Sequence, residues 1–161
     1  MNATILFSSI QDKLPKKIGR FRKFLIKNIK SSEPIMSNEE LLKKLESLSE
    51  TELNEVAKIL KKDKLDSPVT CFWLYNLLLG CYGVAWFRIN MFSVGCMKLI
   101  LLIIASNLKE INPEISGILD LDKFIAFWCL FDLFIIGAIL RNKNLEKVNN
   151  IIDLVRARNA N

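Results

Sequence analysis

Apolar residues recur every three or four positions across residues 5–30, the spacing of one face of an α-helix. Lysine and arginine fill the positions between them, and Pro15 interrupts the pattern where it suits the start of a helix. We expect a basic amphipathic segment over residues 1–30 that lies on anionic lipid, although the same stripe could pack on a partner subunit or on residues 37–62. The stripe comprises Phe7, Ile10, Leu14, Ile18, Phe21, Leu25 and Ile29.

Two S-x-x-E capping boxes follow a linker at residues 31–36. In such a box the serine and glutamate side chains each bond the other residue's backbone N–H at the start of a helix. Leucines at helical spacing follow both boxes, so we expect a cytosolic helical hairpin over residues 37–66 that needs another surface to pack on. The boxes pair Ser37 with Glu40 and Ser49 with Glu52.

Three apolar segments make up the next region, which we expect to be a membrane domain over residues 67–140. Val69–Phe87 would extend about 28 Å as a helix, close to the hydrocarbon thickness of a bilayer. Met91–Leu108 and Phe124–Leu140 are also long, although each contains a charged residue that costs about 3 kcal/mol to insert. Their apolar residues outweigh that cost. The pattern predicts an all-α integral membrane protein with two to three membrane-embedded helices.

Charge is divided unevenly among these regions. Residues 1–68 hold 14 of the 23 Lys and Arg residues, whereas residues 69–108 hold two basic residues and no acidic one. Residues 141–161 hold five more basic residues, and we expect a basic cytosolic tail there. Because basic loops tend to stay in the cytoplasm, the amino-terminal region should lie there too. The tail lies outside if all three segments cross, and inside if the middle one only dips into one leaflet, which we favour.

The residues most often used for metal binding and acid–base catalysis are scarce. The sequence has no histidine, and its four cysteines lie within apolar stretches without a C-x-x-C pair. We interpret the cysteines as packing residues and expect no disulfide, metal, cofactor, small-molecule substrate or enzyme activity. In a chain with apolar helices, the net charge of +6 indicates anionic lipid rather than nucleic acid. The cysteines are Cys71, Cys81, Cys96 and Cys129.

Two charged residues lie inside the apolar segments at matching depth. Lys98 lies 8 residues before Ser106, and Asp132 lies 8 residues after Phe124. In antiparallel helices joined by residues 107–123, both would lie about 12 Å into the membrane. We therefore predict an ion pair between them, with Lys98 extending to the headgroups as the alternative. Asp132 would then be structural, although single carboxylates in membranes also mark ion or proton paths.

Glycine and aromatic positions in this region form a further pattern. An apolar helix ends in two glycines three residues apart, an aromatic residue and an arginine follow, and a later span reads W-x-x-x-D-L. These positions are Gly80, Gly83, Phe87 and Arg88, then Gly95, Trp128, Asp132 and Leu133. Over roughly residues 68–140 the chain resembles the "TM-two" domain family, in which paired membrane helices flank a degenerate Asp-Arg-Phe type linker. Ala85, Trp86, Arg88 and Asn90 depart from the family's pattern, so the resemblance rests on the other positions.

The resemblance implies paired membrane helices and no particular activity. The start of the chain lacks the basic residues and apolar core of a signal peptide, which is more similar to the bacterial members. We expect a non-catalytic subunit, anchor or scaffold in a bacterial inner membrane, crossing more than once and bringing a protein partner there or forming a homo-oligomer. The alternative is an oligomeric pore or an ion- or proton-conducting protein that uses Asp132 and Lys98.

Overall fold

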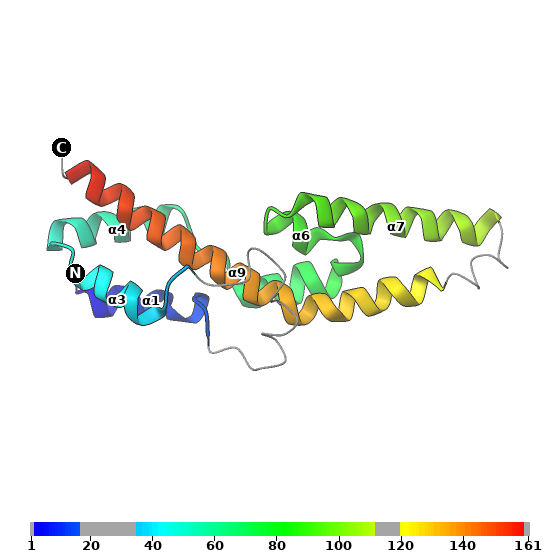
Figure 1. Cartoon of the computed structure of the whole chain (residues 1–161), viewed down its shortest axis with the longest axis horizontal. Helices are drawn as coiled ribbons and strands as arrows, with labels where there is room; N and C mark the ends of the chain where they lie inside the picture. The colour runs from blue at the N-terminus through cyan, green and yellow to red at the C-terminus, as the bar shows by residue number, and fades with distance from the viewer. Residues whose placement is uncertain (1, 17–34, 112–119, 160–161) are drawn as a thin grey trace. The chain divides into compact units, whose positions relative to one another are not determined.

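The computed structural model describes residues 2–16, 35–111 and 120–159, and within these residues all regular structure is helical. The chain divides into two compact units (Figure 1). One comprises Met1–Ser67 with Ala138–Asn161 and is named the amphipathic unit here. The other comprises Pro68–Gly137 and is named the apolar unit. The longest helix, α9 (Leu121–Asn159), contributes residues to both.

In the amphipathic unit, α1 (Ala3–Ile10) and a 3₁₀ turn (Gln11–Lys13) precede α3 (Asn38–Glu46) and α4 (Glu50–Lys62). Both predicted capping boxes are confirmed. Each serine hydroxyl accepts from the backbone N–H of its glutamate, and each glutamate carboxylate accepts from the backbone N–H of its serine. Figure 1 shows these helices around the orange-to-red part of α9.

The core of the amphipathic unit corrects the prediction for residues 141–161. Residues 141–159 continue α9 instead of forming a separate tail, and their apolar residues are buried against those of α1, α3 and α4. Leu145, Val148, Ile152 and Val155 are all fully buried. Their spacing of three or four residues forms one helical face, which supplies the packing surface that the hairpin needs.

The described part of the basic amphipathic segment also packs in this core. Leu6, Ile10 and Leu14 are buried with the hairpin leucines, which is the predicted alternative of packing on residues 37–62. Pro15 is not helical, and α1 ends before it, so the helix expected to start at Pro15 is not seen there. Residues 17–34, which include most of the basic positions and most of the linker, lie outside the described residues.

The apolar unit contradicts the expectation of one helix over Val69–Phe87. A turn of α5 (Pro68–Thr70) leads into a π-helix (Cys71–Leu78) and a 3₁₀ turn (Gly80–Tyr82), and α6 (Val84–Arg88) then starts afresh. The helix axis breaks at Gly83, whose φ of +71° is readily adopted by glycine. The segment is long enough for a bilayer by residue count, but it is not one straight helix.

Among the residues that the structure describes, two helices are long and apolar enough to cross a membrane. They are α7 (Phe92–Ile111) and the first half of α9, which lie side by side in Figure 1. Only 17% of the apolar stretch of α7 is buried within the protein, compared with 39% for α9. The core helix of a water-soluble protein is mostly buried, and the apolar stretch of α7 is not.

Candidate functional site

A buried ion pair lies at the centre of the apolar unit. The ammonium Nζ of Lys98 on α7 donates to the carboxylate Oδ2 of Asp132 on α9 at 2.5 Å. The two side chains are 0% and 1% exposed. The sequence placed both residues at the same depth, and the structure brings them into contact. Each charge offsets the desolvation of the other, which is the condition for keeping charges in an apolar interior.

Two tryptophans also contact this pair. The indole Nε1 of the buried Trp86 on α6 donates to the same Asp132 oxygen at 2.9 Å. The ammonium of Lys98 lies 5.8 Å from the ring centroid of Trp128, within cation–π range. Asp132 on α9 therefore contacts α6 through Trp86 and α7 through Lys98.

Trp86 was missed as a site residue, because the sequence comparison treated it only as a departure from the linker motif. Its indole N–H needs a hydrogen-bond acceptor when buried. Asp132 is the only acidic residue within the apolar segment Phe124–Leu140. The two residues lie 46 positions apart in the sequence, so the available signal was chemical: an apolar-segment tryptophan N–H and a lone carboxylate in another apolar segment.

The predicted glycine motif forms the close packing of α6 against α7. A Cβ on Gly83 would lie 2.8 Å from the carbonyl oxygen of Gly95, and a Cβ on Gly95 would lie 2.7 Å from the Phe87 ring. Both distances are shorter than side chains tolerate. Gly80 does not join this contact, since its nearest neighbour is the side-chain oxygen of the buried Asn76.

Arg88 lies apart from these contacts. Its side chain is exposed, and its guanidinium carbon lies 5.9 Å from the Tyr75 ring centroid. The candidate site is therefore defined by Lys98, Asp132 and Trp86, with Trp128 beside Lys98.

The cysteines differ from the expectation that all four are packing residues. Cys71 is buried, whereas Cys81 and Cys96 are exposed. The sulfurs of Cys81 and Cys129 lie 3.3 Å apart as free thiols. This contact joins positions 48 residues apart and had no sequence signal, because neither cysteine belongs to a recognisable spacing motif.

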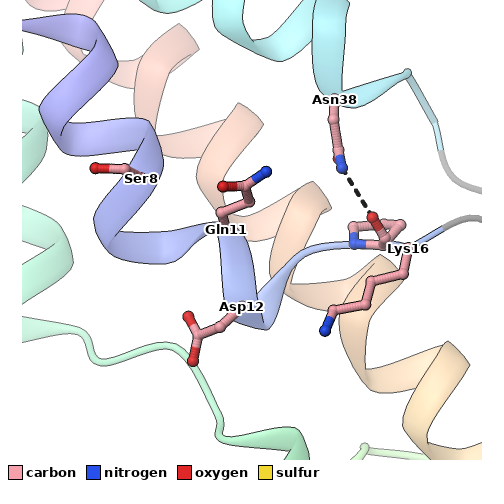
Figure 2. Close-up of a pocket in the computed structure, with 6 residues that line it drawn as sticks. Ser8, Gln11, Asp12, Lys16 and Asn38 are labelled. Atoms are coloured by element: carbon pink, nitrogen blue, oxygen red, sulfur yellow. Dashed lines mark hydrogen bonds between the residues drawn. The ribbon is translucent and has the colours of Figure 1, made fainter.

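The amphipathic unit contains a pocket of about 530 Å³ beside α1 and α3 (Figure 2). The Ser8 hydroxyl donates to the carbonyl of Ile5 at 2.9 Å, and the Asn38 amide donates to the carbonyl of Pro15 at 2.8 Å. Both bonds join a side chain to a backbone carbonyl and so fix the local backbone. The other lining residues are Gln11, Asp12 and Lys16.

Comparison of the chain with family models, curated proteins and solved structures finds no match. The resemblance to the "TM-two" domain family therefore stays a prediction. The contacts above, rather than relatives, are the basis for the functional proposal.

Proposed function

We propose that the chain is a multi-pass integral membrane protein whose apolar unit lies in the bilayer and whose amphipathic unit lies in water. One observation carries this proposal: the apolar unit buries the one charged residue in the middle of each candidate crossing and exposes many large apolar side chains. Lys98 and Asp132 are buried, whereas Trp73 is 60% exposed and Ile103 is 53% exposed. In water, so large an apolar surface would drive aggregation, whereas lipid solvates it.

The two candidate crossings support an arrangement with both flanking regions on one side. Residues 3–14 and 145–155 share one core, although they lie before and after the apolar unit in the chain. An even number of crossings satisfies this, and α7 with the first half of α9 supplies two. The broken segment before α7, rather than the middle segment, then dips into one leaflet. We place the shared side in the cytoplasm of a bacterial cell, because of its basic residues.

In this arrangement the protein acts as a non-catalytic anchor, subunit or scaffold. The amphipathic unit has its own core and capped helices, so it can present a stable charged surface to a partner protein or to a second copy. Anionic lipid headgroups are a further partner for its basic residues. Purification in mild detergent tests the role, since a stoichiometric partner supports a subunit or scaffold and a homo-oligomer alone argues against recruitment.

Alkaline carbonate extraction of native membranes tests the membrane location. We expect the full chain to stay in the pellet, because α7 and the first half of α9 leave most of their apolar surface outside the protein interior. Release into the wash, alongside a peripheral marker protein, would contradict the proposal.

The alternative function is ion or proton conduction, and the charged pair within an apolar unit is the observation in its favour. The pair's two charges neutralise each other inside one chain, which supports the structural role. Reconstituted liposomes distinguish the two: we expect no conductance from the wild type. Conductance that disappears in Asp132→Asn would establish the alternative.

A further inference from the structure

The free thiols of Cys81 and Cys129 lie close enough to react with each other. Their sulfurs are 3.3 Å apart, and a disulfide bond needs about 2.0 Å, so closure requires the sulfurs to approach by about 1.3 Å. Cys81 lies in the 3₁₀ turn Gly80–Tyr82, which is a short turn at the surface and not part of a long helix. A turn of this kind can shift by that amount more easily than α9 can.

We propose that Cys81 and Cys129 form an oxidation site that closes to an intramolecular disulfide, with molecular oxygen as the electron acceptor. Both S–H bonds break and one S–S bond forms. The two electrons and two protons released reduce one oxygen molecule to hydrogen peroxide. Oxygen suits the site because the exposed side chains beside the two cysteines in sequence, Tyr82 and Leu130, are large and mostly apolar. Molecular oxygen is itself apolar, so these side chains do not prevent it from reaching the thiols.

The disulfide would cross-link two parts of the apolar unit that sequence separates by 48 residues. It would hold the break in the helix at Gly80–Gly83 against α9, one helical turn from Asp132. In the thiol state this region relies on packing and on the Trp86 to Asp132 hydrogen bond. Oxidation would therefore fix the position of α6 relative to the ion pair without changing any charge.

The test uses the full chain purified in mild detergent and exposed to air with copper–phenanthroline, which catalyses thiol oxidation by oxygen. Thiols are then counted with a maleimide under denaturing conditions, and linked peptides are identified by mass spectrometry after digestion without reductant. We expect the count to fall from four to two, with one linked peptide pair containing Cys81 and Cys129. Dithiothreitol should restore all four thiols.

Three variants make the result specific. Cys81→Ser and Cys129→Ser should each prevent the intramolecular link, whereas the matched control Cys96→Ser should form it as the wild type does. Circular dichroism of each variant shows whether it is folded before oxidation. The proposal is overturned if the folded wild type keeps four thiols, or if the link that forms involves Cys71, Cys96 or a second chain.

Discussion

Both units of this protein are helical, but they differ in where their charged and apolar side chains lie. The amphipathic unit buries leucine, isoleucine and valine, and its ion pairs Lys44–Asp153 and Arg158–Glu55 are partly exposed. The apolar unit buries Lys98 and Asp132 and exposes aromatic and aliphatic side chains. Helical structure alone therefore says little about the solvent. The position of the charges, inside or outside, is the observation on which we propose that one unit lies in water and the other in lipid.

The largest effect is expected from separating the buried charges. Lys98→Leu or Asp132→Leu alone should lower the free energy of unfolding in detergent by about 3–5 kcal/mol, because each leaves an unpaired buried charge. The double variant should recover much of that loss. Losses that simply add in the double variant would show that the two charges do not interact.

The surface pair in the other unit is the matched control. Lys44 Nζ lies 2.7 Å from Asp153 Oδ1, but the side chains are 25% and 51% exposed. Lys44→Met should therefore cost no more than about 1 kcal/mol. A loss of unfolding free energy as large as that of Lys98→Leu would contradict the expected difference between an exposed and a buried ion pair.

A charge placed on the outer face of α7 tests which solvent surrounds it. Ile103 lies near the middle of this helix and is 53% exposed. In lipid, Ile103→Asp should reduce insertion by about 3–4 kcal/mol. In water the same change at an exposed position would be nearly neutral. Glycosylation-tagged insertion assays measure the effect, with Ile103→Leu as the control, and unchanged insertion would contradict the lipid environment.

Truncation of the α9 core face should damage the amphipathic unit. Leu145 is 0% exposed, so Leu145→Ala should cost about 2–5 kcal/mol by loss of burial and creation of a cavity. Leu154 lies on the same helix and is 45% exposed, so Leu154→Ala should change stability by about 0.5 kcal/mol or less. Chemical denaturation in mild detergent compares the two. Equal effects would mean that residues 141–159 do not pack in this core.

The smallest expected effect is the loss in acid of the stability that the second capping box contributes. The backbone N–H and then the hydroxyl of Ser49 donate to the Glu52 carboxylate, and they lower the pKa of Glu52 below its ordinary value of 4.5. A carboxyl with a lower pKa in the folded state stabilises the fold above its unfolded pKa. That contribution is lost as pH falls through the folded pKa. The melting temperature of Glu52→Gln should lie below that of the wild type at neutral pH, and the gap should close in acid.

Local signals predicted local structure well. The serine and glutamate of each capping box determine a helix start within four residues, and both boxes form as expected. The depth of Lys98 and Asp132 followed from the helical rise alone, and the two side chains are in contact. These inferences depend only on spacing along one helix or two adjacent ones.

Two of the predictions that the structure contradicts rested on composition and on segment length, and not on which residues share a helix face. Residues 141–161 were assigned by their basic composition, although Leu145, Val148 and Ile152 already formed an apolar face. Val69–Phe87 was assigned by length, although Gly80 and Gly83 both allow a break. The Cys81 to Cys129 contact depends on that break, and a sequence pattern that assumes a straight helix cannot place the two sulfurs together.

The core of the amphipathic unit can close only after the ribosome has synthesised α9. The Lys44 side chain contacts Asn149, which follows it by 105 residues, and the α9 core face extends to Val155. The ribosome must translate the 88 residues from Pro68 to Val155 after Ser67 before that core can close. At roughly 5–20 residues per second this takes about 4–18 s. During that interval the leucines of α3 and α4 lack the α9 part of their packing surface, so nascent chains should depend on chaperones until α9 is complete.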